Sequence, residues 1–168
     1  MNSKRLLNVV ITSVACVGID QLTKLIAKRT LVDGELITLL GDSIRLQLAR
    51  NYGTFLSLGA SLPEGVRTAA TTIGVGVILV ALLGYAVFSR AANSVAVFAM
   101  AMLLGGGLSN LFDRIAYGGY VLDFLNVGIG PLRTGIFNVA DMFIMAGVFV
   151  MLFSERIQRR ISKPDKPE

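Results

Sequence analysis

The sequence predicts an α-helical integral membrane protein, a four-transmembrane-helix bundle with a small extracytoplasmic β-rich platform. The first reason is composition: 54% of the 168 residues are hydrophobic and 16% are charged, whereas about 45–50% of residues are apolar in soluble domains. The second is that the charges are grouped, which leaves uncharged runs long enough to cross a bilayer. The third is an alternation of apolar and polar residues in one loop, which is typical of β-strands.

Four segments are predicted to span the membrane as helices. Residues 68–89 and 91–112 carry no charged side chain, and each run is longer than the roughly 20 residues that cross about 30 Å of hydrocarbon. Residues 6–27 and 135–154 are nearly as apolar but contain acidic residues, so they can span only if these groups find partners. A spanning segment must satisfy its own backbone hydrogen bonds, and runs of this length do so as helices.

The basic residues predict that both termini lie in the cytoplasm. Lys4 and Arg5 precede the first span, and Arg90 lies between the second and the third. Five more follow the fourth span: Arg156, Arg159, Arg160, Lys163 and Lys166. In a chain of four spans these places share one side, which the positive-inside rule assigns to the cytoplasm. The opposite loops also contain basic residues, so the asymmetry is incomplete.

We therefore expect a single membrane domain, residues 1–155, and a cytoplasmic tail, residues 156–168. Two outside loops, residues 28–66 and 113–134, are expected to form the platform. In the first loop, apolar and polar residues alternate after a Gly-Asp turn signal, which predicts a hairpin. In the second loop, Tyr120–Leu125 lies between glycine-rich turns, which predicts one short strand.

The composition also excludes several kinds of chemistry. The chain has no histidine, and its one cysteine, Cys16, lies within an apolar run. A histidine-assisted nucleophile, a disulfide framework and most zinc sites are therefore excluded. The net charge of +5 reflects basic residues at membrane edges, where anionic lipid head groups lie, so we expect no nucleic-acid partner. The apolar run that ends at Cys16 is interpreted as an uncleaved span rather than a cleaved leader, because further spans follow.

Two sets of polar residues fall within or beside the predicted spans, where an ionised group costs several kcal/mol unless it is paired or hydrated. Asp20 and Lys24 are four residues apart, on one helix face, and can neutralise each other; a purely structural role is the favoured interpretation. Asn110, Asp113 and Arg114 end the third span at spacings that place them in one direction. A guanidinium at this boundary can hold a backbone carbonyl or a phosphate.

A third set consists of Asp123 in the second loop, Asp141 in the first turns of the fourth span, and Asn138 three residues before Asp141. Asn138 can hydrogen-bond the Asp141 carboxyl from the same face. If the loop folds back over the membrane edge, the two carboxyls can share a proton, one acting as base toward a water and the other as acid toward a scissile carbonyl. A proton relay and plain solvation of the loop remain open at this point.

The order of these motifs resembles the lipoprotein signal peptidase family, also called signal peptidase II. The matching segments cover most of the chain: Asp20-Gln21-Leu22-Thr23-Lys24, Asn51-Tyr52-Gly53, Gly105-Gly106 with Asn110-Leu111-Phe112-Asp113-Arg114, Val121-Leu122-Asp123-Phe124 and Phe137-Asn138-Val139-Ala140-Asp141.

The resemblance implies an aspartyl endopeptidase of the bacterial cytoplasmic (inner) membrane, with its active site at the edge of the outer leaflet. Such an enzyme removes the signal peptide of a prolipoprotein before a cysteine that already carries diacylglyceryl. It implies no metal and no organic cofactor. The expected partners are the prolipoprotein substrate and membrane lipid, and we expect a monomer.

The resemblance also assigns roles to individual residues. Asp123 and Asp141 would be the catalytic dyad. The residues that bind substrate or support the dyad would be Asn51, Gly53, Asn110, Arg114, Asn138 and Ala140. Three polar residues would hold the architecture: Asp20, Lys24 and Asp113.

The chain departs from the family pattern at two places. Thr54-Phe55-Leu56-Ser57 follows the Asn-x-Gly motif, where the family has small residues before a phenylalanine, and Ser109 stands where the family commonly has glycine. Both departures are expected to lie near the substrate groove, so substrate preference or inhibitor fit can differ.

Two other classes of function are weighed against the peptidase. A proton-coupled carrier would use Asp20, Asp113 and Asp141 as a relay and needs acids spread through the membrane depth; the acids here instead map to one edge. A non-catalytic assembly factor would tolerate Asp123→Asn, whereas a peptidase would not.

Overall fold

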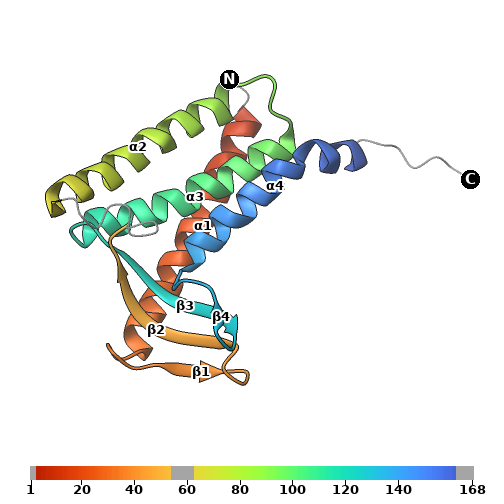
Figure 1. The fold of residues 1–168 in the computed structure, drawn as a ribbon. Helices are drawn as coiled ribbons and strands as arrows, with labels where there is room; N and C mark the ends of the chain where they lie inside the picture. The colour runs from red at the N-terminus through yellow and green to blue at the C-terminus, as the bar shows by residue number, and fades with distance from the viewer. Residues whose placement is uncertain (1–2, 54–62, 162–168) are drawn as a thin grey trace, which may run out of the picture.

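The computed structural model describes residues 3–53 and 63–161, which form four helices and one four-stranded sheet (Figure 1). The helices are α1 (Ser3–Thr30), α2 (Glu64–Phe88), α3 (Ser94–Ala116) and α4 (Val139–Ile161). The strands are β1 (Ile37–Leu39), β2 (Ile44–Asn51), β3 (Val121–Ile129) and β4 (Leu132–Arg133). The sheet lies beyond the helices, beside the C-terminal end of α1 and the start of α4 (Figure 1).

Three helices of the described chain, α1, α2 and α3, are long and apolar enough to cross a membrane. The prediction of a helical membrane protein is thus confirmed. In α4 the apolar residues 142–154 lie between Asp141 and Glu155, and as a helix they extend only about 20 Å. The fourth crossing therefore stays a prediction.

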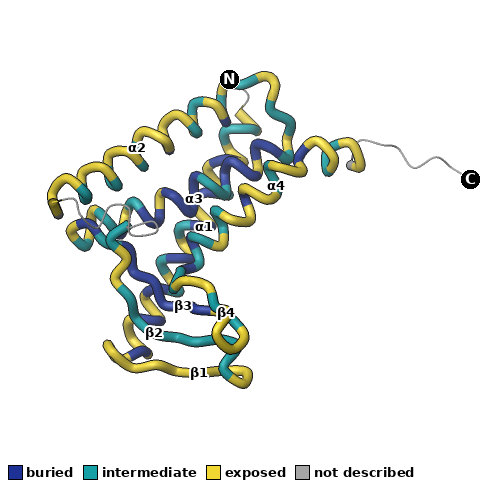
Figure 2. Tube along the Cα trace, viewed as in Figure 1, coloured by how far each residue is buried: buried dark blue, intermediate teal, exposed yellow. Residues whose placement is uncertain are grey.

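Helix α3 is the centre of the bundle, and three successive glycines let its neighbours approach. A Cβ added at Gly105 would lie 2.5 Å from the Cys16 Cβ of α1, and one at Gly107 would lie 2.5 Å from a Leu79 methyl of α2. A Cβ at Gly106 would lie 2.5 Å from the Ala140 carbonyl oxygen of α4. Successive helical residues point about 100° apart, so each glycine faces a different helix. Figure 2 shows the result: α3 is mostly buried, whereas α2 is mostly exposed.

Replacing Gly106 by alanine is expected to lower the free energy of unfolding by about 1–3 kcal/mol, because the added methyl group meets the backbone of α4, which cannot rotate away. Gly74→Ala is the matched control, since a Cβ there meets nothing within 4 Å. Thermal unfolding in one detergent compares the two variants. Equal stability would show that α3 and α4 can separate without loss.

The sheet is antiparallel, in the order β1-β2-β3-β4. The platform hairpin predicted in the first loop is thus present as β1 and β2. The prediction of one short strand in the second loop is wrong, because β3 runs to Ile129 and turns into β4. Gly128 interrupts no strand: it permits close pairing, since a Cβ there would collide with the Leu132 carbonyl.

Strand β2 contains a β-bulge between Leu46 and Ala49, which shifts its register against β3. Beyond the bulge, Ala49 pairs with Asp123 and Asn51 pairs with Val121. An unbroken register would place Asn51 opposite Tyr120, and residues directly opposite each other share a face of the sheet. The bulge therefore moves Asn51 onto the face that carries Asp123.

Candidate active site

Helix α4 begins with a reciprocal cap between Asn138 and Asp141. The Asn138 side-chain oxygen accepts a hydrogen bond from the Asp141 backbone N–H at 3.0 Å, and the Asp141 carboxylate accepts one from the Asn138 backbone N–H at 3.2 Å. Such a capping box satisfies two N–H groups that a helix start otherwise leaves free. The cap thus fixes the Asp141 carboxyl at the positive end of the helix dipole.

The residue before this cap joins α4 to the sheet. The Phe137 backbone pairs with Leu125 of β3 in both directions, with N–H to oxygen distances of 2.9 Å. This pairing brings Asn138 beside Asp123, and the Asn138 side-chain N–H donates to the Asp123 carboxyl at 2.6 Å. One fully buried asparagine therefore contacts both predicted catalytic acids.

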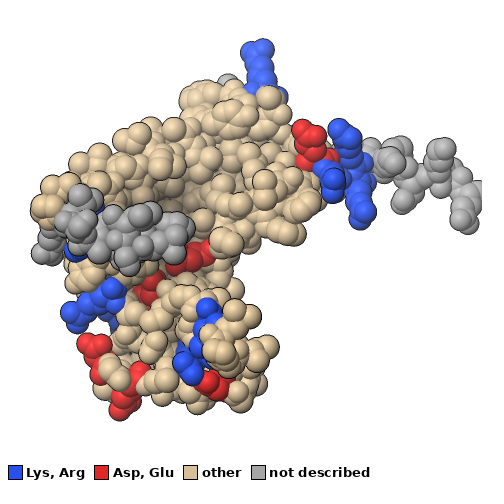
Figure 3. All heavy atoms as spheres, in the orientation of Figure 1, with Lys and Arg blue, Asp and Glu red and all other residues tan. Residues whose placement is uncertain are grey.

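Two further asparagines hold the acids from other elements. Asn51, placed by the bulge in β2, donates to the second oxygen of Asp123 at 2.9 Å. Asn110 of α3 donates to Asp141 at 2.9 Å, and its own side-chain oxygen accepts from Asn138 at 3.1 Å. The three asparagines and two acids thus form one connected group, and acidic atoms are visible where the helices meet the sheet (Figure 3).

The two acids differ in their surroundings. Asp123 is 1% exposed, and burial raises its pKa to about 6, an effect that the negative charge of Asp141 reinforces and the hydrogen bonds from the asparagines partly offset. Asp141 is half-buried, so water reaches the group from its side. Two neighbouring carboxyls in unequal environments are the arrangement in which one holds a proton while the other is ionised.

A buried ion-pair cluster of Asp20, Lys24 and Asp113 contacts the group of three asparagines and two acids through Asn110. The Lys24 ammonium is 2.7 Å from Asp20 and 2.8 Å from Asp113, and all three side chains are at most 2% exposed. Lys24 also donates to the Asn110 side chain at 3.1 Å. Asp20 accepts a hydrogen bond from the Ala140 backbone N–H at 2.8 Å. The cluster therefore ties α1 and α3 to the start of α4.

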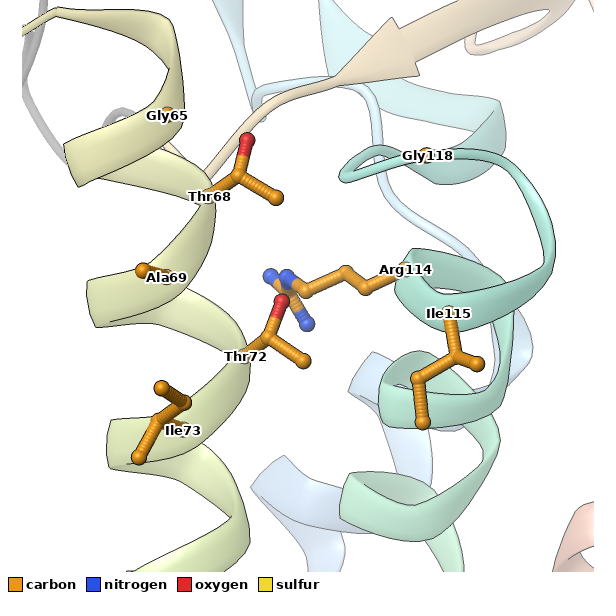
Figure 4. Close-up of a pocket in the computed structure, with 8 residues that line it drawn as sticks. All are labelled: Gly65, Thr68, Ala69, Thr72, Ile73, Arg114, Ile115 and Gly118. Atoms are coloured by element: carbon orange, nitrogen blue, oxygen red, sulfur yellow. The ribbon is translucent and has the colours of Figure 1, made fainter.

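Arg114 and Gly53 lie at the side of the site that faces α2. Gly53 has a φ of +77°, and its N–H donates to the Asn51 side chain, which orients that asparagine. An added Cβ at Gly53 would lie 2.9 Å from a Thr71 methyl and 3.5 Å from an Arg114 nitrogen. The Arg114 guanidinium points toward α2 (Figure 4), and one of its nitrogens lies 3.3 Å from the Asn110 carbonyl.

Every site residue predicted from the sequence thus lies in or beside one region, but three details differ from expectation. The Asp113 side chain points toward Lys24 of α1, whereas the Arg114 side chain points toward α2, so the prediction that they face one direction is wrong. Ser109, expected near a substrate groove, is instead fully buried and donates to Asp20 at 2.6 Å. Sequence reasoning misses Gln21, which donates to Asp113 at 2.8 Å; its place one residue after Asp20 is the available signal. Thr54-Phe55-Leu56-Ser57 lies outside the described residues.

Comparison with known proteins places the chain in a family. A family model described as signal peptidase (SPase) II matches residues 12–156. A lipoprotein signal peptidase of Caldicellulosiruptor bescii is 38% identical over 136 residues, covering 80% of this chain and 81% of that protein. One of Treponema denticola is 31% identical over 169 aligned residues, covering 95% and 97%. A solved bacterial membrane enzyme has a TM-score of 0.75 at 26% identity, covering 88% of this chain and 91% of the other. The chain belongs to the lipoprotein signal peptidase family, signal peptidase II, a family of membrane proteases.

Proposed function

We propose that this chain is the endopeptidase that removes the signal peptide of diacylglyceryl-modified prolipoproteins, cleaving before the lipidated cysteine with an aspartate dyad and an activated water. The observation that carries the proposal is the position of Asn138, which hydrogen-bonds Asp123 through its side chain and Asp141 through its backbone. One residue thereby sets the relative position of the two carboxyls. Cleavage by paired carboxyls needs that positional control.

In the proposed reaction Asp141 is the base and Asp123 is the acid. Asp141 accepts hydrogen bonds from Asn110 and the Asn138 backbone and caps α4, and these contacts stabilise its negative charge. Asp123 holds a proton more firmly because it is buried. Asp141 takes a proton from a water, the water oxygen bonds to the scissile carbonyl carbon, and Asp123 donates its proton to the carbonyl oxygen. Collapse of the tetrahedral diol then breaks the C–N bond: the amine nitrogen takes the proton that Asp141 acquired, and a diol hydroxyl returns a proton to Asp123.

The remaining site residues position the substrate or the dyad. Arg114 has donors at the α2 side of the dyad and can hold a substrate carbonyl. Asn51 orients Asp123, and Gly53 orients Asn51 through its backbone N–H. Ala140 fixes the start of α4 through its N–H on Asp20. Asp20, Lys24 and Asp113 serve as the structural support.

We propose four membrane crossings, with α4 as the fourth, both termini in the cytoplasm and the sheet outside. This topology puts the dyad at the edge of the outer leaflet, the depth at which the cleavage point of a lipid-anchored substrate lies. The protein acts as a monomer in the bacterial inner membrane. Cysteine labelling with a membrane-impermeant reagent tests it: a cysteine at Leu40 should react from outside the cell, and one at Arg159 should not.

A gel-shift assay in detergent tests the activity itself. The protein is expected to convert a diacylglyceryl-modified prolipoprotein to a product that begins at the lipidated cysteine, as mass spectrometry of the new terminus would show. A correctly folded protein that leaves this substrate intact would contradict the proposal.

The pH dependence of kcat/KM tests the assignment of the acid. Activity is expected to fall as the pH rises through about 6, because Asp123 then loses the proton it donates.

The hydrogen bond from Asn51 stabilises the Asp123 carboxylate, so the loss of this hydrogen bond in Asn51→Ala raises the Asp123 pKa. The alkaline limb of the profile should therefore move to higher pH by about one pH unit. Asn126 lies on β3, the strand of Asp123, but its side chain donates to the Thr134 carbonyl. Asn126→Ala should therefore leave the alkaline limb in place.

A further inference from the structure

A polar cavity of about 320 Å³ lies at the end of the bundle that is farthest from the sheet. Its walls come from the first turns of α1 and from the residues that join α2 to α3: Lys4, Arg5, Asn8, Ala92, Ser94 and Val97. Figure 1 shows the N-terminus beside the link from α2 to α3, on the far side of the bundle from the strands. The cavity is therefore separate from the candidate dyad.

Arg5 fastens α1 to the end of α2 through one nitrogen of its guanidinium. The Arg5 Nε donates to the Ala86 carbonyl at 2.6 Å, and Ala86 lies in the last turn of α2, where carbonyls lack a partner within the helix. The Arg5 Nη2 is buried and has no hydrogen-bond partner among the residues that the structure describes. Nearly all buried donors in native proteins are satisfied, so a ligand in the cavity is the available source of an acceptor.

No acidic residue neutralises Arg5 within the described chain, whose ion pairs all join other residues. Residues 1–19 and 65–112, which contain the whole lining of the cavity, include no Asp or Glu. Lys4 adds a second cation to the same lining. A cluster of basic side chains at a membrane edge attracts anionic lipid head groups.

The polar groups of this lining are arranged as donors. The Thr12 hydroxyl donates to the Asn8 side-chain oxygen at 3.4 Å, so the Asn8 amide presents its N–H groups to the cavity side as donors. Asn8 follows Arg5 by three residues and therefore lies on the same helix face. A guanidinium and an amide one turn apart suit a ligand with several acceptor oxygens, and phosphate is an anion of this kind.

The cavity lies at the depth of lipid head groups. The rise along α1 from Lys4 to Lys28 is about 36 Å, slightly more than a hydrocarbon core about 30 Å thick. Leu7 and Ile11 follow Lys4 on the same helix face, and both are more than half exposed. A lipid with its phosphate in the cavity would have its acyl chains along this apolar face. In the proposed topology this end of α1 is in the cytoplasmic leaflet, which carries anionic lipids.

We propose that this cavity binds the phosphate group of one anionic phospholipid, which accepts hydrogen bonds from Arg5 and Asn8 and places its acyl chains along Leu7 and Ile11. The bound lipid contacts α1 and the start of α3 together, because both line the cavity. The site takes no part in cleavage. Anionic phospholipid is a structural ligand here, and it stabilises the folded protein by mass action.

Non-denaturing mass spectrometry tests which ligand the cavity holds. The wild-type protein is released from detergent that contains equal amounts of phosphatidylglycerol and phosphatidylcholine with the same acyl chains, and a parallel sample contains inorganic phosphate. One phosphatidylglycerol is expected to stay bound under conditions that remove phosphatidylcholine. Equal retention of the two lipids, retention of neither, or retention of inorganic phosphate in place of lipid would overturn the proposal.

Two variants test whether the lipid binds at this cavity. Arg5→Gln removes the charge, and Asn8→Leu removes the amide donors while it leaves the contact of Arg5 with Ala86 in place. Arg159→Gln is the matched control: it removes one positive charge from an exposed residue of α4 that pairs with Glu155 and does not line the cavity. The apparent Kd for phosphatidylglycerol is obtained from the rise of the thermal unfolding midpoint with lipid concentration.

The Kd is expected to rise about tenfold in Arg5→Gln and about fivefold in Asn8→Leu, because a hydrogen bond from a charged donor is stronger than one from a neutral donor. Arg159→Gln should leave it unchanged. An effect of Arg159→Gln as large as that of Arg5→Gln would show that surface charge alone attracts the lipid, and the proposal would fail. If Arg5→Gln does not fold, Asn8→Leu decides, since an unchanged Kd there rules the site out. Neither measurement uses a prolipoprotein, so both stay decisive whatever the cleavage assay shows.

Discussion

Asp123→Asn and Asp141→Asn are each expected to lower kcat for cleavage of a lipidated prolipoprotein by about 10²–10⁴-fold while changing KM little. Each substitution preserves the size of the side chain but removes a group that accepts or donates a proton in the reaction, and a positioned acid or base contributes about 10²–10⁴-fold. Groups that act as a unit are not additive, so the double variant should be no slower than the worse single one.

Both variants should fold, which makes the loss of activity interpretable. In Asp123→Asn the amide oxygen of the introduced side chain can still accept the 2.6 Å hydrogen bond from Asn138. Asp42→Asn is the control, because Asp42 pairs with Arg45 at the far hairpin of the sheet and should leave kcat unchanged. Thermal unfolding is measured alongside the gel-shift assay for all three variants.

The same experiment separates the competing classes of function. A non-catalytic assembly factor would support lipoprotein maturation in cells with Asp123→Asn as well as with wild type. A carrier would leave the prolipoprotein uncut in the purified assay with every variant. Cleavage by Asp42→Asn and wild type, with neither dyad variant active, is the pattern that the peptidase alone predicts.

The parts of this site that the sequence predicts are those set by local spacing. Asp20 and Lys24 are one helical turn apart, so their contact at 2.7 Å follows from the helix alone. The contact between Asn138 and Asp141 is likewise local, because it is the cap of α4. The uncharged runs predict α2 and α3 because burial of their backbone in lipid permits only a helix.

The parts that the sequence does not predict depend on pairing between distant segments. The contact of Asp123 with Asn138 requires the pairing of Leu125 with Phe137, and the contact with Asn51 requires an inserted residue in β2. Neither feature leaves a local pattern, because a bulge is recognised only from the register of its partner strand. The direction of Arg114 toward α2 likewise depends on where α2 packs.

Lys24→Met is expected to cause the largest loss of stability, about 3–5 kcal/mol, because it removes the one cation between two buried carboxylates. Methionine fills a similar volume, so the effect is electrostatic rather than a cavity. Asp20 and Asp113 then face each other without neutralisation, and Asn110 loses the 3.1 Å hydrogen bond that helps to orient it against Asp141. Unfolding in detergent with increasing denaturant measures the change in stability.

A second substitution in the same cluster separates charge from packing. Asp113→Asn added to Lys24→Met restores the net charge of the cluster, because one negative and one positive charge have both been removed. In the wild type, two neutral groups donate hydrogen bonds to Asp113: the Gln21 side chain and the Leu122 N–H. The amide oxygen of the introduced asparagine can still accept from one of them. The double variant should therefore regain at least half of the stability that Lys24→Met loses. If it is no more stable than Lys24→Met, the lysine stem contributes through packing, and uncompensated charge is not the reason that the cluster is needed.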